Sequence, residues 1–306
     1  MQVIALIILG VLMTIFMVIF VKDMIKSHKD NKQKYHKSEV LMAFAFLAPA
    51  IVMMFFFVIL PIFMSLGYSF TDYNLMDPDN IGLAGDGFDN FRRLFRDELI
   101  GYAIANTALF VVLVVPLQIG MALLLALFVN NKKRGTTIFK VCFFAPVAIS
   151  LSVTAYIWKQ IIPSDDLNTQ YVAIIWIVFL SAWQGCGFQM LIFLSALGNI
   201  RKDLYEAAKV DGANVFQRFK TVTLPGLRPT MLYILITVFI GACRVMVQPM
   251  LLTTFQPQTV TMSLYMYKLG MEYWTVGYSC TIALMMTIFT GSITFLQRKL
   301  LGEKKK

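Results

Sequence analysis

The sequence carries little charge for its length. Charged residues make up 14% of the 306 residues and hydrophobic residues 58%, whereas a soluble domain carries roughly 25% charged residues. So much apolar surface does not fit inside one water-soluble core, so the bilayer must solvate part of it. The composition therefore predicts an all-α, polytopic membrane protein.

Motifs for several kinds of chemistry are also missing. The sequence contains no G-x-x-x-x-G-K-[ST] phosphate loop, so we do not expect this chain to bind ATP. The two histidines, His28 and His36, lie in a lysine-rich segment and are expected to be solvated. The four cysteines fall inside apolar runs without a C-x-x-C pair, which favours packing over metal or redox chemistry. No nucleophile–base pair is recognisable, so an enzyme is not indicated.

Long apolar runs are what the sequence has instead. Seven runs are long enough to span a bilayer, at about 1–21, 40–68, 102–129, 137–162, 170–196, 231–253 and 278–297. Four prolines lie in or near them: Pro61, Pro116, Pro146 and Pro249. Because proline removes a backbone donor, kinked helices are expected there, either around a cavity or as ordinary helix distortion.

Basic residues are distributed unevenly between these runs. If 22–39, 130–140, 198–230 and the C-terminus face the cytoplasm, 21 of the 27 Lys and Arg lie inside and five outside. The positive-inside rule favours this orientation, with the N-terminus outside and the C-terminus cytoplasmic. Clustering in short loops also argues against a nucleic-acid partner.

The first run, 1–21, has two interpretations. A signal peptide has basic residues before its apolar core, whereas here they follow the run. We therefore expect a retained helix, so that residues 1–39 form an extra transmembrane helix with a basic loop and 40–306 a six-helix core.

The inner segment 198–230 has helical spacing and amphipathic character. One helical face carries Val215, Phe216 and Phe219. Gly212 divides the segment into two helices, and Pro225 and Pro229 are expected to end it. Such a helix–turn–helix either rests on lipid headgroups or docks into a cytosolic partner.

A specific spacing runs through this segment. Glu-Ala-Ala is followed after three residues by Gly, and after nine more by an aliphatic residue, one free position and Leu-Pro. The positions are Glu206, Ala207, Ala208, Asp211, Gly212, Val222, Leu224 and Pro225. This spacing resembles the EAA loop of ABC importer permeases. The likeness extends over about residues 42–297 and is to the maltose-type carbohydrate permeases, in particular the subunit with an extra N-terminal helix.

The resemblance implies a permease subunit of an ATP-driven importer in the bacterial plasma membrane. A second, similar permease would complete the pathway, and two cytosolic ATPases carrying ATP and Mg would grip the EAA loops. An extracytoplasmic binding protein would deliver a sugar or oligosaccharide, although glycerol-phosphate and polyol importers share the pattern. A self-sufficient secondary transporter or channel is the alternative, and it would need buried acids that the apolar runs lack.

Polar residues inside the runs mark a candidate substrate pathway. Arg244 is placed near the middle of the sixth run, with Gln248 one helical turn away on the same face. No acid lies at a similar depth, so Arg244 either ties this chain to a partner subunit or takes part in the pathway.

The fifth run brings amide and aromatic side chains together near mid-membrane. These are Trp183, Gln184, Phe188 and Gln189. Amides beside aromatic surface suit a sugar site, while packing and hydrogen bonding between helices is the alternative. Asn106 in the third run is a weaker candidate, because Asn commonly ties helices together.

Overall fold

The computed structural model describes residues 37–79, 81–130, 136–253 and 255–301. These residues form helices joined by turns, as predicted, and the chain divides into two compact units at Ser69. The predicted first span, 1–21, and all but the last residues of the basic loop lie outside the described residues. The two units are described separately below.

The first unit is one interrupted helix. It consists of α2 (Lys37–Met54), a π-helical turn η1 (Phe55–Ile59) and α3 (Leu60–Tyr68). Pro61 lies in the first turn of α3, directly after the π-helical turn, which accommodates its missing amide hydrogen within the continuing helix. Most apolar side chains of this helix are exposed. The predicted span 40–68 is therefore confirmed as a helix of membrane length.

The second unit contains further helices long and apolar enough to cross a membrane. Three of them are α5 (Glu98–Asn130), α9 (Gln170–Asn199) and α15 (Val276–Leu301). Another stretch comprises α11 (Val215–Arg218), the π-helical turn η2 (Phe219–Thr223), α12 (Leu224–Cys243) and α13 (Val247–Leu252). The predicted spans at 102–129, 170–196 and 278–297 are confirmed.

The predicted span 137–162 is sharply bent just after Pro146, where a kink is expected. It consists of α6 (Thr136–Ala148) and α7 (Leu151–Ile161), which are bent by 99° at a short break. Pro146 lies just before this break and cannot donate to the preceding turn. The side-chain amide of Gln184 in α9 donates to the carbonyls of Pro146 and Ile149 at 3.4 and 3.2 Å. A side chain from another helix thus compensates for the interrupted backbone hydrogen bonding.

Pro225 and Pro229 do not end the helical segment, contrary to the prediction. Pro225 lies in the first turn of α12, and Pro229 lies inside it. The helix therefore runs without a turn from Val215 to Cys243. The adjoining π-helical turn η2 widens the backbone before the prolines, which is a common way to accommodate a missing donor.

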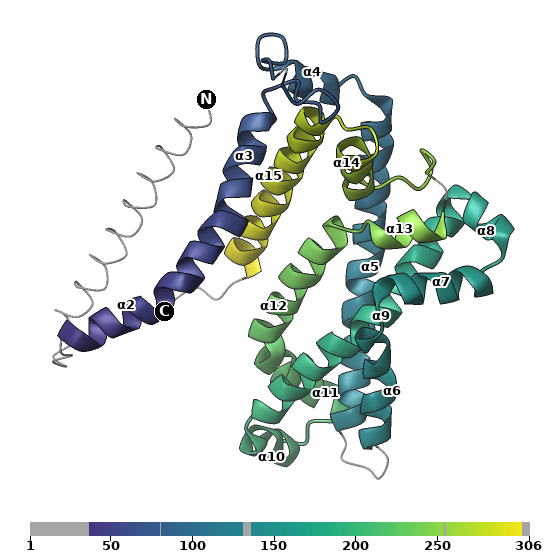
Figure 1. Ribbon diagram of the computed structural model, residues 1–306. Helices are drawn as coiled ribbons and strands as arrows, with labels where there is room; N and C mark the ends of the chain where they lie inside the picture. The colour runs from purple at the N-terminus through teal and green to yellow at the C-terminus, as the bar shows by residue number, and fades with distance from the viewer. Residues whose placement is uncertain (1–36, 80, 131–135, 254, 302–306) are drawn as a thin grey trace. The chain divides into compact units, whose positions relative to one another are not determined.

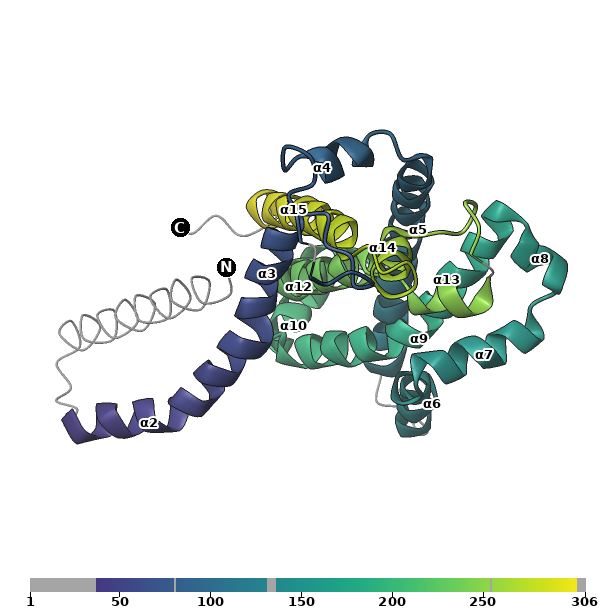
Figure 2. The same ribbon diagram turned by 45° about the horizontal axis from the view of Figure 1, so that its top comes forward.

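Short helices lie in two groups at opposite ends of the long helices of the second unit (Figures 1 and 2). α4 (Asp89–Leu94) and α14 (Met262–Met271) lie at one end of α5, whereas α10 (Lys202–Val210) and α11 lie at the other. α13 lies beside α7 in both views, near the short helix α8 (Ser164–Asn168).

The core of the second unit lies where α5 packs along α9, with α12 against both. Ala122 and Ala126, one turn apart on α5, are fully buried, so the helix backbones approach closely. A Cβ on Gly187 of α9 would collide with the carbonyl oxygen of Phe143 in α6, so glycine is required at this contact. Phe193 fills the space between these helices and is fully buried.

At the end that carries α4 and α14, the carboxylate of Asp97 accepts hydrogen bonds from two helices. The hydroxyls of Tyr265 in α14 and Tyr278 in α15 both donate to Asp97 Oδ2, at 2.7 and 2.8 Å. The guanidinium of Arg93 lies 4.1 Å from the centre of the Tyr278 ring. This cluster joins the start of α5 to α14 and α15.

Candidate functional site

The turn at Gly212 is closed by hydrogen bonds of its own backbone. The amide of Ala213 donates to Ala208 at 2.9 Å, and the amide of Gly212 donates to Lys209 at 3.1 Å. This pair of bonds is a Schellman motif, which satisfies the last carbonyls of α10. Gly212 has a φ of +78°, a left-handed conformation that glycine adopts without a Cβ clash. The predicted division of the segment at Gly212 is confirmed.

The helix that follows begins with its own cap. The side chain of Asn214 accepts from the amide of Gln217 at 2.9 Å, and the Gln217 side chain accepts from the amide of Asn214 at 2.8 Å. Tyr205 of α10 and Thr223 of η2 share a hydrogen bond of 2.9 Å between their hydroxyls. The helix–turn–helix formed by α10 and α11 is therefore fixed by hydrogen bonds at both sides of the turn.

The outer surface of this helix–turn–helix carries a carboxylate among apolar side chains. Glu206 is exposed, and its carboxylate makes no hydrogen bond or ion pair with any described residue. Val210, Val215 and Phe216 are 87%, 75% and 73% exposed, and Leu204 is also exposed. Such a surface suits insertion into a groove of another protein.

The remaining residues of the motif lie around this surface. Phe219, predicted on the face of Val215 and Phe216, is half-buried. Ala208 is half-buried in α10, and the exposed residues are Ala207, Asp211, Leu224 and Pro225.

A second interruption lies between α12 and α13 and corrects the predicted position of Arg244. α12 ends at Cys243, Arg244 is its C-cap residue, and α13 starts at Val247. Arg244 is thus not inside a continuous helix with Gln248. Pro249 has no amide hydrogen to donate to the carbonyl four residues before it, that of Val245. Thr261 Oγ1 donates to that carbonyl instead, at 2.7 Å.

The interruption borders a cavity of about 280 Å³ between α5, α9, α12 and α13. Its polar side chains are Gln118, Ser181, Gln189, Thr237, Arg244 and Gln248. Its apolar wall includes Phe110, Val114 and Leu151. The cavity therefore combines amides, hydroxyls and one guanidinium with apolar surface, which is the usual composition of a small-molecule site.

The polar groups of this cavity differ in whether they have partners. Gln248 donates from its amide nitrogen to Ser181 Oγ at 3.2 Å. Gln118, Gln189 and Arg244 make no side-chain hydrogen bond with the described part of the chain, and the amide oxygen of Gln189 is buried without a donor. No Asp or Glu is present among the residues that line the cavity.

The structure brings Gln189, Arg244 and Gln248 together but places three other candidates elsewhere. The Trp183 ring lies 5.7 Å from that of Trp158, where α9 packs on α7. Gln184 bonds to the carbonyls at the α6–α7 break. Asn106 is 3% exposed and donates to the carbonyls of Pro257 and Val260, both at 2.9 Å. Each of these three contacts ties parts of the chain together.

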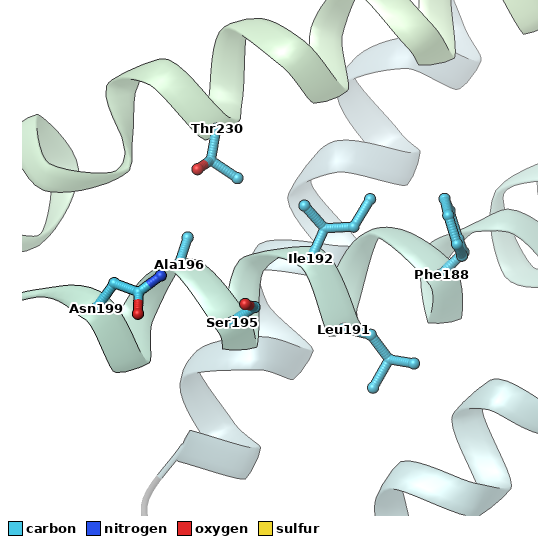
Figure 3. Close-up of a pocket in the computed structure, with 7 residues that line it drawn as sticks. All are labelled: Phe188, Leu191, Ile192, Ser195, Ala196, Asn199 and Thr230. Atoms are coloured by element: carbon cyan, nitrogen blue, oxygen red, sulfur yellow. The ribbon is translucent and has the colours of Figure 1, made fainter. Parts of the chain in front are cut away.

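Phe188 lies on a different face of α9. It borders a hollow of about 400 Å³ whose lining comes from α9 and from Thr230 of α12 (Figure 3). Leu191, Ile192 and Ala196 contribute apolar surface to this hollow, whereas the adjacent residue Gln189 lines the cavity beside Arg244.

Three polar residues of the cavity, Gln118, Ser181 and Thr237, were not predicted from the sequence. Gln118 is 9% exposed, and a Cβ on Gly185 of α9 would collide with its amide. The available signal was an amide in a long apolar run, two residues after Pro116. That signal does not tell which face of α5 the amide occupies.

A charged cleft of about 510 Å³ lies along α4, at the end of the second unit away from the helix–turn–helix. Arg92 bonds to Asp86 at 2.6 Å and to Asp89 at 2.7 Å. The hydrogen bond from Arg92 holds the pKa of Asp86 below its usual value, because it stabilises the ionised carboxylate. These groups are exposed, so the pairs contribute little to stability.

Bent and broken helices of membrane length, a polar cavity between them and an exposed helix–turn–helix are the features of a membrane transport protein. Residues 118–302 match the family described as binding-protein-dependent transport system inner membrane component. The chain belongs to this family of ABC transporter permeases.

Individual relatives agree with this assignment. The chain is 32% identical over 290 residues to the probable ABC transporter permease protein YesP of Bacillus subtilis, covering 87% of this chain and 92% of that protein. It is 32% identical over 285 residues to the lactose transport system permease protein LacF of Rhizobium radiobacter, covering 85% and 94%. The fold is similar to a chain from a bacterial ABC transporter that imports the acidic polysaccharide alginate, with a TM-score of 0.75, 22% identity and coverage of 88% and 98%.

Proposed function

We propose that this chain is a permease subunit of an ATP-driven importer for a sugar or oligosaccharide. It forms half of the pathway with a second, similar permease. Two cytosolic ATPases hold ATP and Mg and bind the helix–turn–helix, and an extracytoplasmic solute-binding protein delivers the cargo. The chain lies in the bacterial plasma membrane, with its N-terminus outside and residues 198–230 in the cytoplasm.

The observation that carries the coupling role is the geometry at Gly212. The Schellman motif and the capping box hold α10 and α11 in a fixed arrangement through hydrogen bonds within the turn itself. Glu206 and the apolar side chains Val215 and Phe216 are left exposed beside the turn. A rigid element with an exposed carboxylate and apolar side chains can transmit movement from an ATPase, because the ATPase can bind these side chains and the turn keeps its conformation.

The relatives support the class of cargo. Besides the lactose permease, they include the arabinooligosaccharide transport permease AraP of Bacillus subtilis, which is 28% identical over 284 residues. One structure of the alginate transporter holds a periplasmic protein bound to an alginate pentasaccharide. A sugar therefore fits better than glycerol phosphate or a polyol, and the amides of the cavity suit sugar hydroxyls.

A self-sufficient secondary transporter is less well supported. Such a protein needs its own ion-coupling groups near the membrane centre, often acids. The cavity between α5, α9, α12 and α13 contains no acidic side chain. Coupling to ATP hydrolysis through the exposed helix–turn–helix accounts for the same structure without such groups.

The coupling role is tested by Glu206→Ala, with Asp203→Asn as the matched control. Asp203 is an acid on the same helix, and it already pairs with Arg201. Loss of a hydrogen bond to a charged group costs about 1.5–3 kcal/mol, so ATPase co-purification and transport-stimulated hydrolysis should fall roughly tenfold or more in Glu206→Ala. Both are measured on the complete importer in reconstituted membranes, with solute-loaded binding protein present.

The control separates coupling from general damage to α10. Asp203→Asn should leave both quantities near wild type, and the binding protein should keep its affinity for its solute in both variants because it is a separate chain. Wild-type co-purification and hydrolysis in Glu206→Ala would show that the helix–turn–helix lies on lipid headgroups and does not bind an ATPase.

A further inference from the structure

The cavity between α5, α9, α12 and α13 has a positive charge that the described residues do not neutralise. Arg244 is its single charged lining residue, and the guanidinium makes no hydrogen bond or ion pair with the described residues. A second cation near α13, Lys159, behaves differently, because its ammonium donates to the carbonyl of Leu251 at 3.0 Å. Arg244 is thus free to bind an anion, whereas Lys159 is used to hold α13.

We infer that this cavity binds an acidic sugar, with the sugar carboxylate bound by Arg244. The inference rests on the proposed function and names its substrate class. A planar guanidinium matches a carboxylate with two parallel hydrogen bonds. A charge in a membrane protein is costly unless it serves a pathway or a partner, so a substrate that supplies the counter-charge gives a reason for Arg244 at this position.

The other lining groups recognise the neutral part of a sugar. The side-chain amides of Gln118 and Gln189 have no hydrogen-bond partner among the described residues, so they are available to sugar hydroxyls. Phe110 and Leu151 provide apolar surface for C–H groups of the ring. One guanidinium, uncommitted amides and an apolar wall together match a sugar acid better than a neutral sugar.

The geometry of the break explains why the guanidinium is free. Carbonyls at the break already have side-chain donors, since Thr261 binds Val245 and the Ser263 hydroxyl lies 3.5 Å from the carbonyl of Cys243. Arg244 is therefore not needed to cap the end of α12. Its long side chain remains available to the cavity that it lines.

The substrate class is tested by comparing uptake of acidic disaccharides with uptake of their neutral counterparts by the complete importer. Digalacturonate and diglucuronate are compared with their carboxyl-reduced, neutral forms in proteoliposomes that contain both permeases, the ATPases and the binding protein. We expect wild type to prefer at least one acidic disaccharide over its neutral form. Arg244→Gln should lower that uptake at least tenfold and lower uptake of the neutral form by clearly less, while Arg244→Lys keeps part of the acidic uptake.

The outcomes separate this inference from the proposed function. Uptake of neutral sugars alone by wild type would overturn the acidic substrate and leave the sugar importer intact, whereas failure to import any sugar would overturn the proposed function itself. An equal loss of acidic and neutral uptake in Arg244→Gln would also overturn the inference. So would loss of the partner permease on co-purification of that variant, because Arg244 would then be a tie between subunits.

Discussion

Two interruptions of helical structure, at Gly212 and at Arg244, are stabilised in different ways. At Gly212 the partners of the freed backbone groups lie within a few residues, in the Schellman motif and the Asn214 capping box. At Arg244 the carbonyl of Val245 is bound by Thr261, sixteen residues further along the chain. The first interruption is a local structure, whereas the second exists only when distant segments pack together.

This difference suits the two roles. A docking element has to keep its shape while the membrane helices around it move, and local hydrogen bonds preserve that shape. A cavity that opens and closes during transport gains from a break whose hydrogen bonds depend on neighbouring helices. Movement of the 253–262 segment relative to α12 would change the support of the break and the cavity together.

Replacing Gly212 by valine is expected to have the largest effect on transport. A left-handed conformation costs an L-residue roughly 1–2 kcal/mol, and more for a β-branched side chain. Gly212→Val should displace α11 from α10 and reduce ATP-driven uptake to below about a tenth of wild type. Uptake by the reconstituted importer and affinity of the binding protein for its solute are measured side by side.

Gly212→Asn is the matched control for this change. Asn visits the left-handed region more readily than other residues that carry a Cβ, and no heavy atom lies within 4 Å of the Cβ position at Gly212. Uptake should therefore be largely retained. Equal loss in both variants would mean that the turn matters for contact with a partner and not for its backbone conformation.

The same contrast explains what the sequence could predict. Gly212, the motif around Glu206 and the long helices follow from local spacing, so their positions were predictable. Kinks were expected near Pro146 and Pro249, but the 99° size of the bend between α6 and α7 and the complete break at Arg244 were not, because their compensating donors, Gln184 and Thr261, are far away in sequence. Gln184 was recognised as an unusual polar residue, but the sequence does not show which carbonyls it faces.

Thr261→Val should weaken the break at Arg244 without touching the cavity lining. Loss of the hydroxyl leaves the buried carbonyl of Val245 without its donor, which costs about 1–3 kcal/mol, and it also removes the weaker 3.4 Å cap on the Leu264 amide at the start of α14. We expect a lower melting temperature of the purified importer. Thr287→Val is the control, because the exposed Thr287 donates to Ala283 within its own helix. Equal shifts in the two variants would argue that the break does not depend on the distant hydroxyl.

The cluster around Asp97 gives the smallest expected effect and the sharpest test of long-range support. Asp97 accepts from both Tyr265 and Tyr278, so Tyr278→Phe leaves one donor and keeps the ring beneath Arg93. The single change should cost about 0.5–1.5 kcal/mol, seen as a lowering of the melting temperature by a few degrees.

Combining Tyr265→Phe with Tyr278→Phe should cost more than the sum of the single changes, because the carboxylate then has neither hydroxyl and residues that share a partner are not additive. Tyr267→Phe is the control on α14, since its hydroxyl makes no hydrogen bond with the described residues. Additive single effects would show that each tyrosine contributes independently. In that case the shared carboxylate would not be what joins α5, α14 and α15.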